Sequence, residues 1–168
     1  MLDEGDAPEL HALIEANRGR LSEWLPWAAA QSPEDTRAFI ARTREQVARN
    51  DGFQVAVVRE GRIAGVIGYI SVDWGNRATG IGYWLGEEYE GEGTMTASAR
   101  ALTGHALVEW GLSRVEIRVA TGNRRSRAIP ERLGFREEGT LRTAQRIGDR
   151  YVDLAVYSML AEDWPGRS

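Results

Sequence analysis

The chain has 168 residues, of which 42% are hydrophobic and 27% charged, and this composition predicts one globular domain over residues 1–168. It has no Cys and all 21 basic residues are Arg, so disulfides, thiolate catalysis, Cys-ligated metals, Schiff-base lysines and the P-loop lysine are excluded. The net charge of −4 without a basic block, and the lack of a signal pattern or of roughly 18 consecutive apolar residues, predict a cytoplasmic protein with no metal, nucleic-acid or membrane partner.

Two helices are expected between residues 6 and 50. The first has an N-terminal cap and apolar residues spaced i, i+3 and i+4: Asp6, Leu10, Leu13 and Ile14. The second has a serine cap, a proline at the first helical position, an acid at the third and apolar residues further along: Ser32, Pro33, Asp35, Phe39, Ile40 and Val47. The run Asn50-Asp51-Gly52 is expected to end it.

The centre of the chain predicts three antiparallel β-strands: FQVAVVRE, IAGVIGYISVD and TGIGYWLG. A helix from about Thr94 to Trp110 and the strand VEIRVA then form a crossover, which places this strand parallel to its neighbour. A short helix, NRRSRAIPERLGF, and two strands around Gly148-Asp149 follow. This order predicts an α/β (α+β) fold with helices on both faces of one sheet.

The stretch GEEYEGEGTMT, residues 86–96, places Gly91 and Gly93 among four glutamates at a strand-to-helix turn. Glycines before a helix leave backbone N–H groups free to hold an anion. A P-loop is excluded because the chain has no Lys, and a dinucleotide-binding fingerprint is excluded because Thr96 occupies the third glycine position. Two interpretations are left, an anion-binding loop or a Gly-rich turn with a structural role.

Three segments resemble the GCN5-related N-acetyltransferases (GNAT), and within them the RimJ/RimL-like group of ribosomal-protein N-terminal acetyltransferases: GYWLGEEYEGEGTMTASARAL, LSRVEIRVATGNRRSRAIPERLGFREEGTLR and YVDLAVYSML. The resemblance covers nearly the whole chain, including WLPW and PEDTRAFI. It implies the GNAT fold, with a mixed, mostly antiparallel sheet and a splayed parallel strand pair. It also implies acetyl-CoA as co-substrate, with its pyrophosphate wrapped by backbone amides of the loop from Glu88 to Gly93.

The resemblance implies coenzyme contacts along the strand end, the loop and the two helices, from Trp84, Leu85, Gly86, Glu90, Gly91, Glu92, Gly93, Thr94, Met95, Thr96, Asn123 and Arg127. Relatives commonly have Gln, Arg or Lys in this loop, so Glu90 and Glu92 are expected to point their carboxylates to solvent. Four arginines either approach the coenzyme phosphates or form a solvated helix face: Arg124, Arg125, Arg127 and Arg132.

Asn123 and Ser126 match the N-x-x-S motif of the family. By that match Asn123 holds the pantetheine arm or the fold near it, and Ser126 protonates or hydrogen-bonds the coenzyme sulfur. The alternative for Ser126 is a helix cap or first-turn residue. Many relatives outside the group have Tyr where Pro130 stands, and Pro130 predicts a short or kinked helix.

The general base is not evident. The group often has Glu at the position of Gln145, and Gln cannot accept the proton. Gly80 occupies another position where relatives carry an acid, which leaves Glu116 and Asp73 as distant candidates for a base acting through water. A terminal α-amine, with a pKa of about 8, is partly neutral near neutral pH and needs less help than a lysine side chain, so an N-terminal acceptor is favoured.

Trp24, Trp27 and Trp74 are expected either to line an acceptor cleft or to pack the two N-terminal helices onto the core. Relatives begin with a strand before the first helix, whereas this chain reaches Asp6 almost at once, so the first edge strand is shortened or absent. This leaves a weaker edge or room for a dimer contact, in a monomer or a homodimer.

The predicted function is acetyl-CoA-dependent N-acetylation of a primary amine, with a protein or peptide N-terminus as the favoured acceptor. One alternative acceptor is a small-molecule amine, such as an antibiotic or an aminoacyl compound. The other alternative is an acyl-CoA-binding module that has lost its base.

Overall fold

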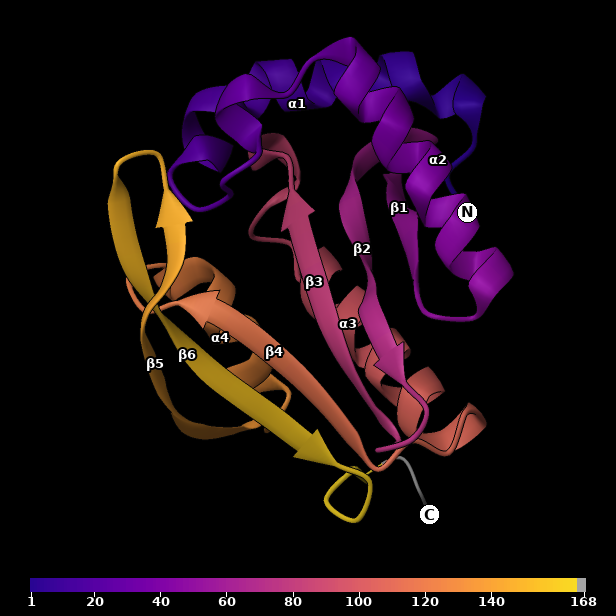
Figure 1. The fold of residues 1–168 in the computed structure, drawn as a ribbon, viewed down its shortest axis with the longest axis vertical. Helices are drawn as coiled ribbons and strands as arrows, with labels where there is room; N and C mark the ends of the chain where they lie inside the picture. The colour runs from indigo at the N-terminus through magenta and orange to yellow at the C-terminus, as the bar shows by residue number, and fades with distance from the viewer. Residues whose placement is uncertain (166–168) are drawn as a thin grey trace.

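The computed structural model describes residues 1–165 and contains one six-stranded sheet with helices on both faces (Figure 1). The helices are α1 (Ala7–Ser22), α2 (Pro33–Arg49), α3 (Thr94–Gly104) and α4 (Arg124–Arg132). The strands are β1 (Phe53–Arg59), β2 (Arg62–Asp73), β3 (Ala78–Leu85), β4 (Arg114–Ala120), β5 (Arg136–Ile147) and β6 (Arg150–Leu160). Short helical turns lie at Glu4–Asp6, Ala28–Ala30, Glu87–Tyr89 and His105–Glu109. All the helices and strands expected from the sequence are present.

The sheet has the strand order β1-β2-β3-β4-β6-β5, and β3 and β4 form its parallel pair. The other neighbours are antiparallel. Strands β3 and β4 pair only from Ala78–Gly80 to Arg114–Glu116, and they then diverge toward their C-terminal ends (Figure 1). The predicted mixed, mostly antiparallel sheet with a splayed parallel pair is therefore confirmed, and the sheet opens where β3 and β4 separate.

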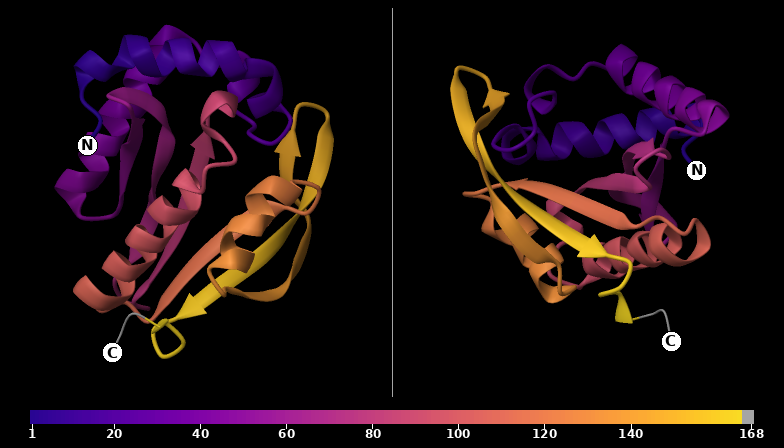
Figure 2. Two further views of the ribbon diagram at one scale, coloured as in Figure 1. Left: turned by 180° about the vertical axis from the view of Figure 1, so that it is seen from behind. Right: turned by 60° about the horizontal axis from the view of Figure 1, so that its bottom comes forward.

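The two faces of the sheet bury separate hydrophobic clusters. Val66 of β2 is buried with Leu10 of α1 and Ile40 of α2. The next residue, Ile67, is buried with Ala99 of α3 in the larger cluster, because adjacent side chains of a strand point to opposite faces. Figure 2 shows α3 and α4 together on one face, away from α1 and α2. Helices on both faces are thus confirmed.

The N-termini of α1 and α2 are capped differently. Ser32 Oγ accepts from Asp35 N at 3.1 Å and the Asp35 carboxylate accepts from Ser32 N at 3.0 Å, as the sequence predicts. The predicted Asp6 cap of α1 is wrong, since Asp6 makes no side-chain hydrogen bond to that helix. Its carboxylate accepts from Asp3 N at 2.9 Å, and Asp3 accepts from Gly5 N at 2.8 Å. The capping box belongs to the turn before α1.

The buried side of α2 is shorter than the helix itself. Thr36, Ile40 and Thr43 are buried, whereas Val47, which lies in the helix as expected, is 47% exposed. The buried stripe ends one turn before the helix does. Asn50, with φ of 57°, ends α2 as expected.

The strand edges and turns agree with the sequence. Within residues 1–165 no strand precedes α1, so β1 is an edge strand of the described sheet. Gly148 has φ of 57° in the turn between β5 and β6, where Ile147 pairs with Arg150. Helix α4, which contains Pro130, is short, at nine residues. Among the described helices, none is long and apolar enough to cross a bilayer.

Candidate active site

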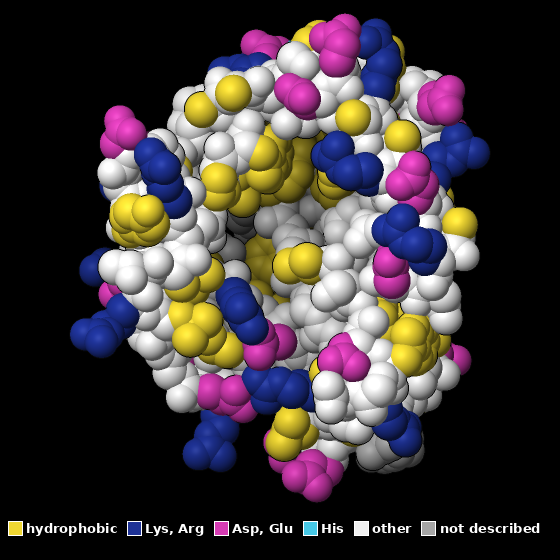
Figure 3. Space-filling view, in the orientation of Figure 1, with side chains coloured by type: hydrophobic (Ala, Val, Ile, Leu, Met, Phe, Trp, Pro, Cys, Tyr) yellow, Lys and Arg dark blue, Asp and Glu magenta, His cyan; other side chains and the backbone are white. Residues whose placement is uncertain are grey.

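A cleft of about 1500 Å³ lies where β3 and β4 diverge. Its walls come from the end of α1, the ends of both strands, the loop before α3, the first turns of α3 and α4, and β5. The space-filling view shows this face hollowed near its centre, with arginine side chains close to the opening (Figure 3). The splayed strands therefore create a site that a continuous sheet would fill.

The loop before α3 presents unpaired peptide nitrogens. Gly91 and Gly93 have φ of 85° and 76°, in the left-handed region that favours glycine. No oxygen of residues 1–165 accepts from the peptide nitrogens of 91–96, and the first paired nitrogen is that of Ala97, which donates to Gly93 O at 2.9 Å. These nitrogens lie at the positive end of the α3 dipole, which suits a phosphate.

The amide of Glu90 is not part of this array. Its nitrogen donates to Glu87 O at 3.1 Å, so this amide of the expected Glu88 to Gly93 loop is not free to hold a phosphate. Glu92 and Gly86 do not line the cleft. Gly86 N donates to Ala64 O at 2.8 Å, which places its backbone in the sheet. The available donors therefore start at Gly91.

The glutamates of the loop are held in ion pairs. The Glu90 carboxylate accepts from Arg20 of α1 and from Arg125 of α4, the latter at 2.9 Å, and its side chain is only 26% exposed. The expectation that it points to solvent is wrong. Glu92 is 57% exposed, as expected, and pairs with Arg59. The carboxylates thus tie the loop to neighbouring elements, and the arginines offset their charge.

Replacing Glu90 with Gln should tighten coenzyme binding at low salt. The change removes a negative charge beside the free amides and releases Arg20 and Arg125 toward the same space. We expect the Kd to fall about fivefold at about 20 mM salt and the gain to shrink at about 500 mM. Calorimetry at both salt concentrations measures this. The exposed Glu88, changed to Gln, is the matched control, and an equal gain there would contradict the assignment.

Asn123 and Ser126 begin α4 at the cleft wall. Asn123 is the N-cap, since its Oδ1 accepts from Ser126 N at 3.1 Å. Ser126 is therefore a first-turn residue, one of the two interpretations of the sequence. Its hydroxyl is 3.3 Å from the hydroxyl of Tyr83 on β3. The two side chains meet across the gap between the diverging strands.

Comparison with known proteins decides the family. The sequence profile of the acetyltransferase (GNAT) domain matches residues 1–136. The chain belongs to the GNAT acetyltransferase family. The putative ribosomal N-acetyltransferase YdaF of Bacillus subtilis (strain 168) is 39% identical over 168 residues, which cover 99% of this chain and 92% of that protein.

Two further relatives agree. The ribosomal-protein-serine acetyltransferase of Escherichia coli (strain K12) is 29% identical over 160 residues, covering 95% of this chain and 89% of that protein. The structure of RimL, a ribosomal L7/L12 α-N-protein acetyltransferase in complex with coenzyme A, matches with a TM-score of 0.91 at 28% identity, covering 96% and 92% of the two chains. The predicted GNAT fold, the N-acetyltransferase activity and the RimJ/RimL-like character are confirmed.

Acetyl-CoA is the co-substrate of this acetyltransferase, and the free amides before α3 fit its pyrophosphate. Of the coenzyme-binding residues predicted from the sequence, nine line the cleft: Trp84, Leu85, Glu90, Gly91, Gly93, Thr94, Met95, Thr96 and Asn123. Sequence reasoning missed Arg20, which also donates to Leu85 O at 2.6 Å, because only the fold brings α1 beside the end of β3.

The arginines of α4 divide into two sets. Arg124, Arg125 and Arg132 line the cleft, and Arg132 donates to Thr96 Oγ1 at 3.3 Å. Arg127 does not line it. Its guanidinium donates to Tyr157 Oη at 2.7 Å and to the Glu137 carboxylate at 3.1 Å, so these partners occupy it and its contact with the coenzyme stays a prediction. Its hydrogen bonds fasten α4 to β5 and β6.

Neither of the distant base candidates, Glu116 and Asp73, lines the cleft, so a base role acting through water stays a prediction for both. Burial opposes ionisation of Glu116, but hydrogen bonds from Arg114 and Arg118 outweigh it and lower the pKa of Glu116. Hydrogen bonds from the backbone and side chain of Asn76 lower the pKa of Asp73. Because the pKa of each carboxyl is lowered, Glu116 in its ion pairs and Asp73 in its turn are both poor proton acceptors.

The cleft itself contains few groups that could take a proton. Among residues 1–165 its carboxylates are Glu23, Glu87 and Glu90, and no histidine lines it. Gln145 does line it, and its side-chain nitrogen donates to Trp24 O at 3.0 Å. Gln145 thus holds the α1–α2 connection against β5.

The three tryptophans lie in different places. Trp24 lines the cleft, with the Arg150 guanidinium 5.8 Å from its ring centre. Trp27 does not line it, and its ring lies 6.0 Å from that of Trp84. Trp74 is also outside, where it donates to Asn50 O at 2.6 Å and packs 5.3 Å from Trp110. Of the two interpretations of the sequence, aromatic packing describes Trp27 and Trp74, and acceptor binding by any of the three tryptophans stays a prediction.

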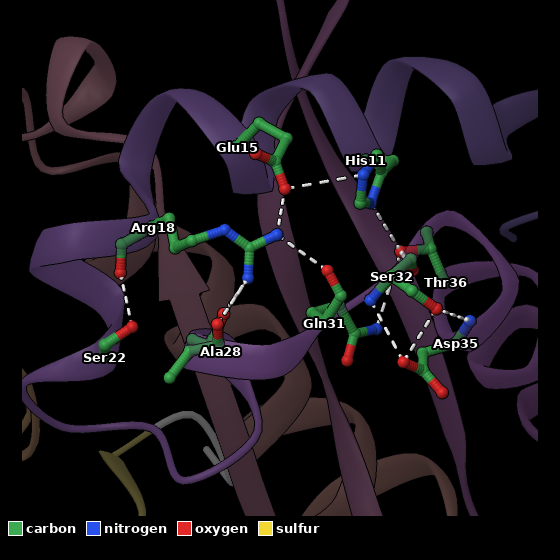
Figure 4. Close-up of polar contacts among 10 residues, drawn as sticks. His11, Glu15, Arg18, Ser22, Ala28, Gln31, Ser32, Asp35 and Thr36 are labelled. Atoms are coloured by element: carbon green, nitrogen blue, oxygen red, sulfur yellow. Dashed lines mark hydrogen bonds and ion pairs between the residues drawn. The ribbon is translucent and has the colours of Figure 1, made fainter.

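Arg18 fixes the connection that carries Trp24 (Figure 4). Its guanidinium donates to the backbone oxygens of Ala28, Ala29 and Gln31, the last two at 3.0 Å and 2.6 Å, and pairs with Glu15. Three carbonyl groups without a regular strand or helix partner are satisfied by one side chain. Arg18 therefore holds the connection between α1 and α2 in place beside the cleft.

Replacing Arg18 with Met should destabilise the fold by about 2 kcal/mol, because the aliphatic length is kept while charged hydrogen bonds to three carbonyls are lost. Chemical denaturation measures this. We also expect a raised KM for the amine and an unchanged Kd for acetyl-CoA. The control is Arg37→Met, at an exposed residue whose one ion pair within residues 1–165 is with Glu34. An equal loss there would contradict the role of Arg18.

Proposed function

We propose that this acetyltransferase acetylates the α-amine of a protein or peptide N-terminus in the cytoplasm, with acetyl-CoA as donor. The observation that carries the donor half is the array of free peptide nitrogens from Gly91 to Thr96 at the start of α3. The acceptor half is supported by the relatives, whose names place ribosomal proteins as their substrates.

The donor is bound along the loop and the inner edge of β3. Beyond Gly80 the edge of β3 that faces β4 has no strand partner among residues 1–165, so main-chain groups near Trp84 are open to an extended pantetheine arm, whereas Leu85 O already accepts from Arg20. The phosphates then lie at the amides of 91–96, with Arg125 and Arg132 beside them. Arginine forks match phosphate oxygens in geometry and charge.

Acetyl transfer needs a neutral amine and a donor to the leaving sulfur. Ser126 supplies the donor at the point where the strands separate. Gln145 supplies no base, because its amide is neutral and donates to Trp24 O. An α-amine with a pKa of about 8 is partly neutral without a base, whereas a lysine amine with a pKa of about 10.4 is not. The missing base therefore favours an N-terminal acceptor.

Thiol release from acetyl-CoA tests this with paired peptides. One peptide has a free N-terminus, and its partner has a blocked N-terminus and an internal lysine. We expect acetylation of the first alone, with kcat/KM rising from about pH 7 to about pH 9 as the α-amine loses its proton. A set of small-molecule amines is tested beside the peptides, and reaction of these amines alone would make the acceptor a small molecule. Coenzyme binding without acetylation of any amine would leave a binding module.

A further inference from the structure

Tyr83 bridges the gap between the diverging strands. From β3 its phenol donates to Ser126 O at 3.0 Å and accepts from Ser126 Oγ at 3.3 Å. Both residues line the cleft. A side chain of one strand therefore contacts both oxygens of the residue that faces the cleft in the first turn of α4.

The phenol of Tyr83 stays protonated while an amine is acetylated. Burial raises the pKa of Tyr83 above its usual value, and the hydrogen bond from Ser126 offsets only part of this rise. A neutral phenol has one hydrogen to donate and lone pairs to accept. It can therefore accept from the Ser126 hydroxyl and donate to another oxygen at the same time.

The Ser126 hydroxyl has no other partner among residues 1–165. A serine hydroxyl can occupy three staggered rotamers. The helix cap at Asn123 uses Ser126 N and leaves the hydroxyl unconstrained. Tyr83 is thus the group that selects the orientation of this hydroxyl.

We propose that Tyr83 is a positioning residue for acetyl transfer, which holds the Ser126 hydroxyl in the cleft. When the Ser126 hydroxyl donates to the sulfur, the phenol hydrogen of Tyr83 turns from the backbone oxygen of Ser126 to Ser126 Oγ. This proposal rests on the role proposed above for Ser126. The exchange moves only hydrogen bonds, and the proton that the sulfur finally takes is the one that the amine loses. Hydrogen bonds in a chain polarise one another, so the bond from Tyr83 to Ser126 Oγ strengthens the bond from Ser126 Oγ to the sulfur.

Steady-state kinetics of Tyr83→Phe and Ser126→Ala, alone and together, test the coupling. Tyr83→Phe should lower kcat about tenfold and change the KM for acetyl-CoA less than about twofold. In the Ser126→Ala background it should change kcat less than about twofold, because the group that it orients is gone. An equal loss in both backgrounds would overturn the proposal.

Tyr69 gives a matched control. It is fully buried, its phenol donates to Leu102 O at 2.6 Å, and it lies outside the cleft. Tyr69→Phe removes the same chemical group and should lower the melting temperature without changing kcat. A fall in kcat equal to that of Tyr83→Phe would mean that both act through stability, which would also overturn the proposal.

Calorimetry supplies a readout that does not need turnover. The coenzyme A thiol is a simple alkane thiol, whose pKa lies above the value of about 8.5 for Cys, so it ionises between about pH 8 and about pH 10.5. A thiolate accepts more strongly from Ser126 than a thiol does. Wild-type affinity for coenzyme A should therefore rise over this range. The rise should be about threefold smaller in Tyr83→Phe, and acetyl-CoA, which has no ionisable thiol, should show no difference.

These experiments distinguish failure of the role proposed for Tyr83 from failure of the proposed N-terminal acceptor. If wild type acetylates no peptide, the acceptor assignment fails, and the pH dependence of coenzyme A binding still tests Tyr83. If peptides are acetylated and Tyr83→Phe matches wild type in kcat and in coenzyme A binding, the role of Tyr83 fails alone.

Discussion

Replacing Ser126 with Ala should lower kcat about 100-fold and change the Kd of acetyl-CoA less than about threefold. The Ser126 hydroxyl lies at the strand divergence, in a cleft that no histidine of residues 1–165 lines and in a chain without Cys. Loss of this donor leaves the developing negative charge on sulfur without a fixed partner. Thiol-release kinetics with both substrates varied, together with calorimetry for acetyl-CoA, separate turnover from binding.

The Ser126→Ala protein should remain folded, because the Asn123 cap uses the backbone nitrogen of residue 126. Ser126→Thr, which keeps a hydroxyl on the same carbon, is the matched control and should retain at least about one tenth of kcat. A Ser126→Ala enzyme with unchanged kcat would remove this residue from the mechanism.

Replacing Gly93 with Ala should raise the Kd of acetyl-CoA about 30-fold, which is about 2 kcal/mol. Gly93 has φ of 76°, a conformation that costs other residues roughly 1–2 kcal/mol. Among residues 1–165 no atom outside the neighbouring backbone lies within 4 Å of the added Cβ, so the methyl group enters the space where a phosphate would approach the amides. Calorimetry with acetyl-CoA and with coenzyme A measures the loss.

Gly61 provides a close control for the backbone effect. It has φ of 77° in the turn between β1 and β2, and a Cβ there also has no atom of the described residues within 4 Å outside the neighbouring backbone. Gly61 does not line the cleft. Gly61→Ala should therefore cost similar stability and leave the Kd unchanged. If both substitutions weaken binding equally, the loop before α3 is not the phosphate site.

Local patterns predicted most of the fold. The capping box at Ser32 and the glycine turn at Gly148 depend on residues within a few positions of each other, so the sequence reveals them directly. The segments predicted as strands have alternating or consecutive apolar residues over a length typical of a β-strand, so they can also be recognised in the sequence. The prediction of Asp6 as the cap of α1 is wrong because Asp3 and Asp6, three positions apart, can both accept hydrogen bonds at the start of a helix.

Contacts between distant residues could not be predicted in this way. The Glu90 carboxylate meets Arg20 and Arg125, which are separated from it by 70 and 35 positions. Arg127 turns away from the cleft because Tyr157 and Glu137 hold its guanidinium. A side chain in a charge-rich helix has several partners within reach, and only packing selects among them.

The sequence by itself determined the helices, the strands, the Gly-rich turn before α3 and the resemblance to an acetyltransferase, because each depends on local spacing or on motifs written along the chain. The tertiary structure alone decided which groups meet in the cleft: the Glu90 ion pairs, the Gln145 contact to Trp24, and Tyr83 against Ser126. The physical reason is the divergence of β3 and β4 after three paired residues, which brings remote side chains to one opening.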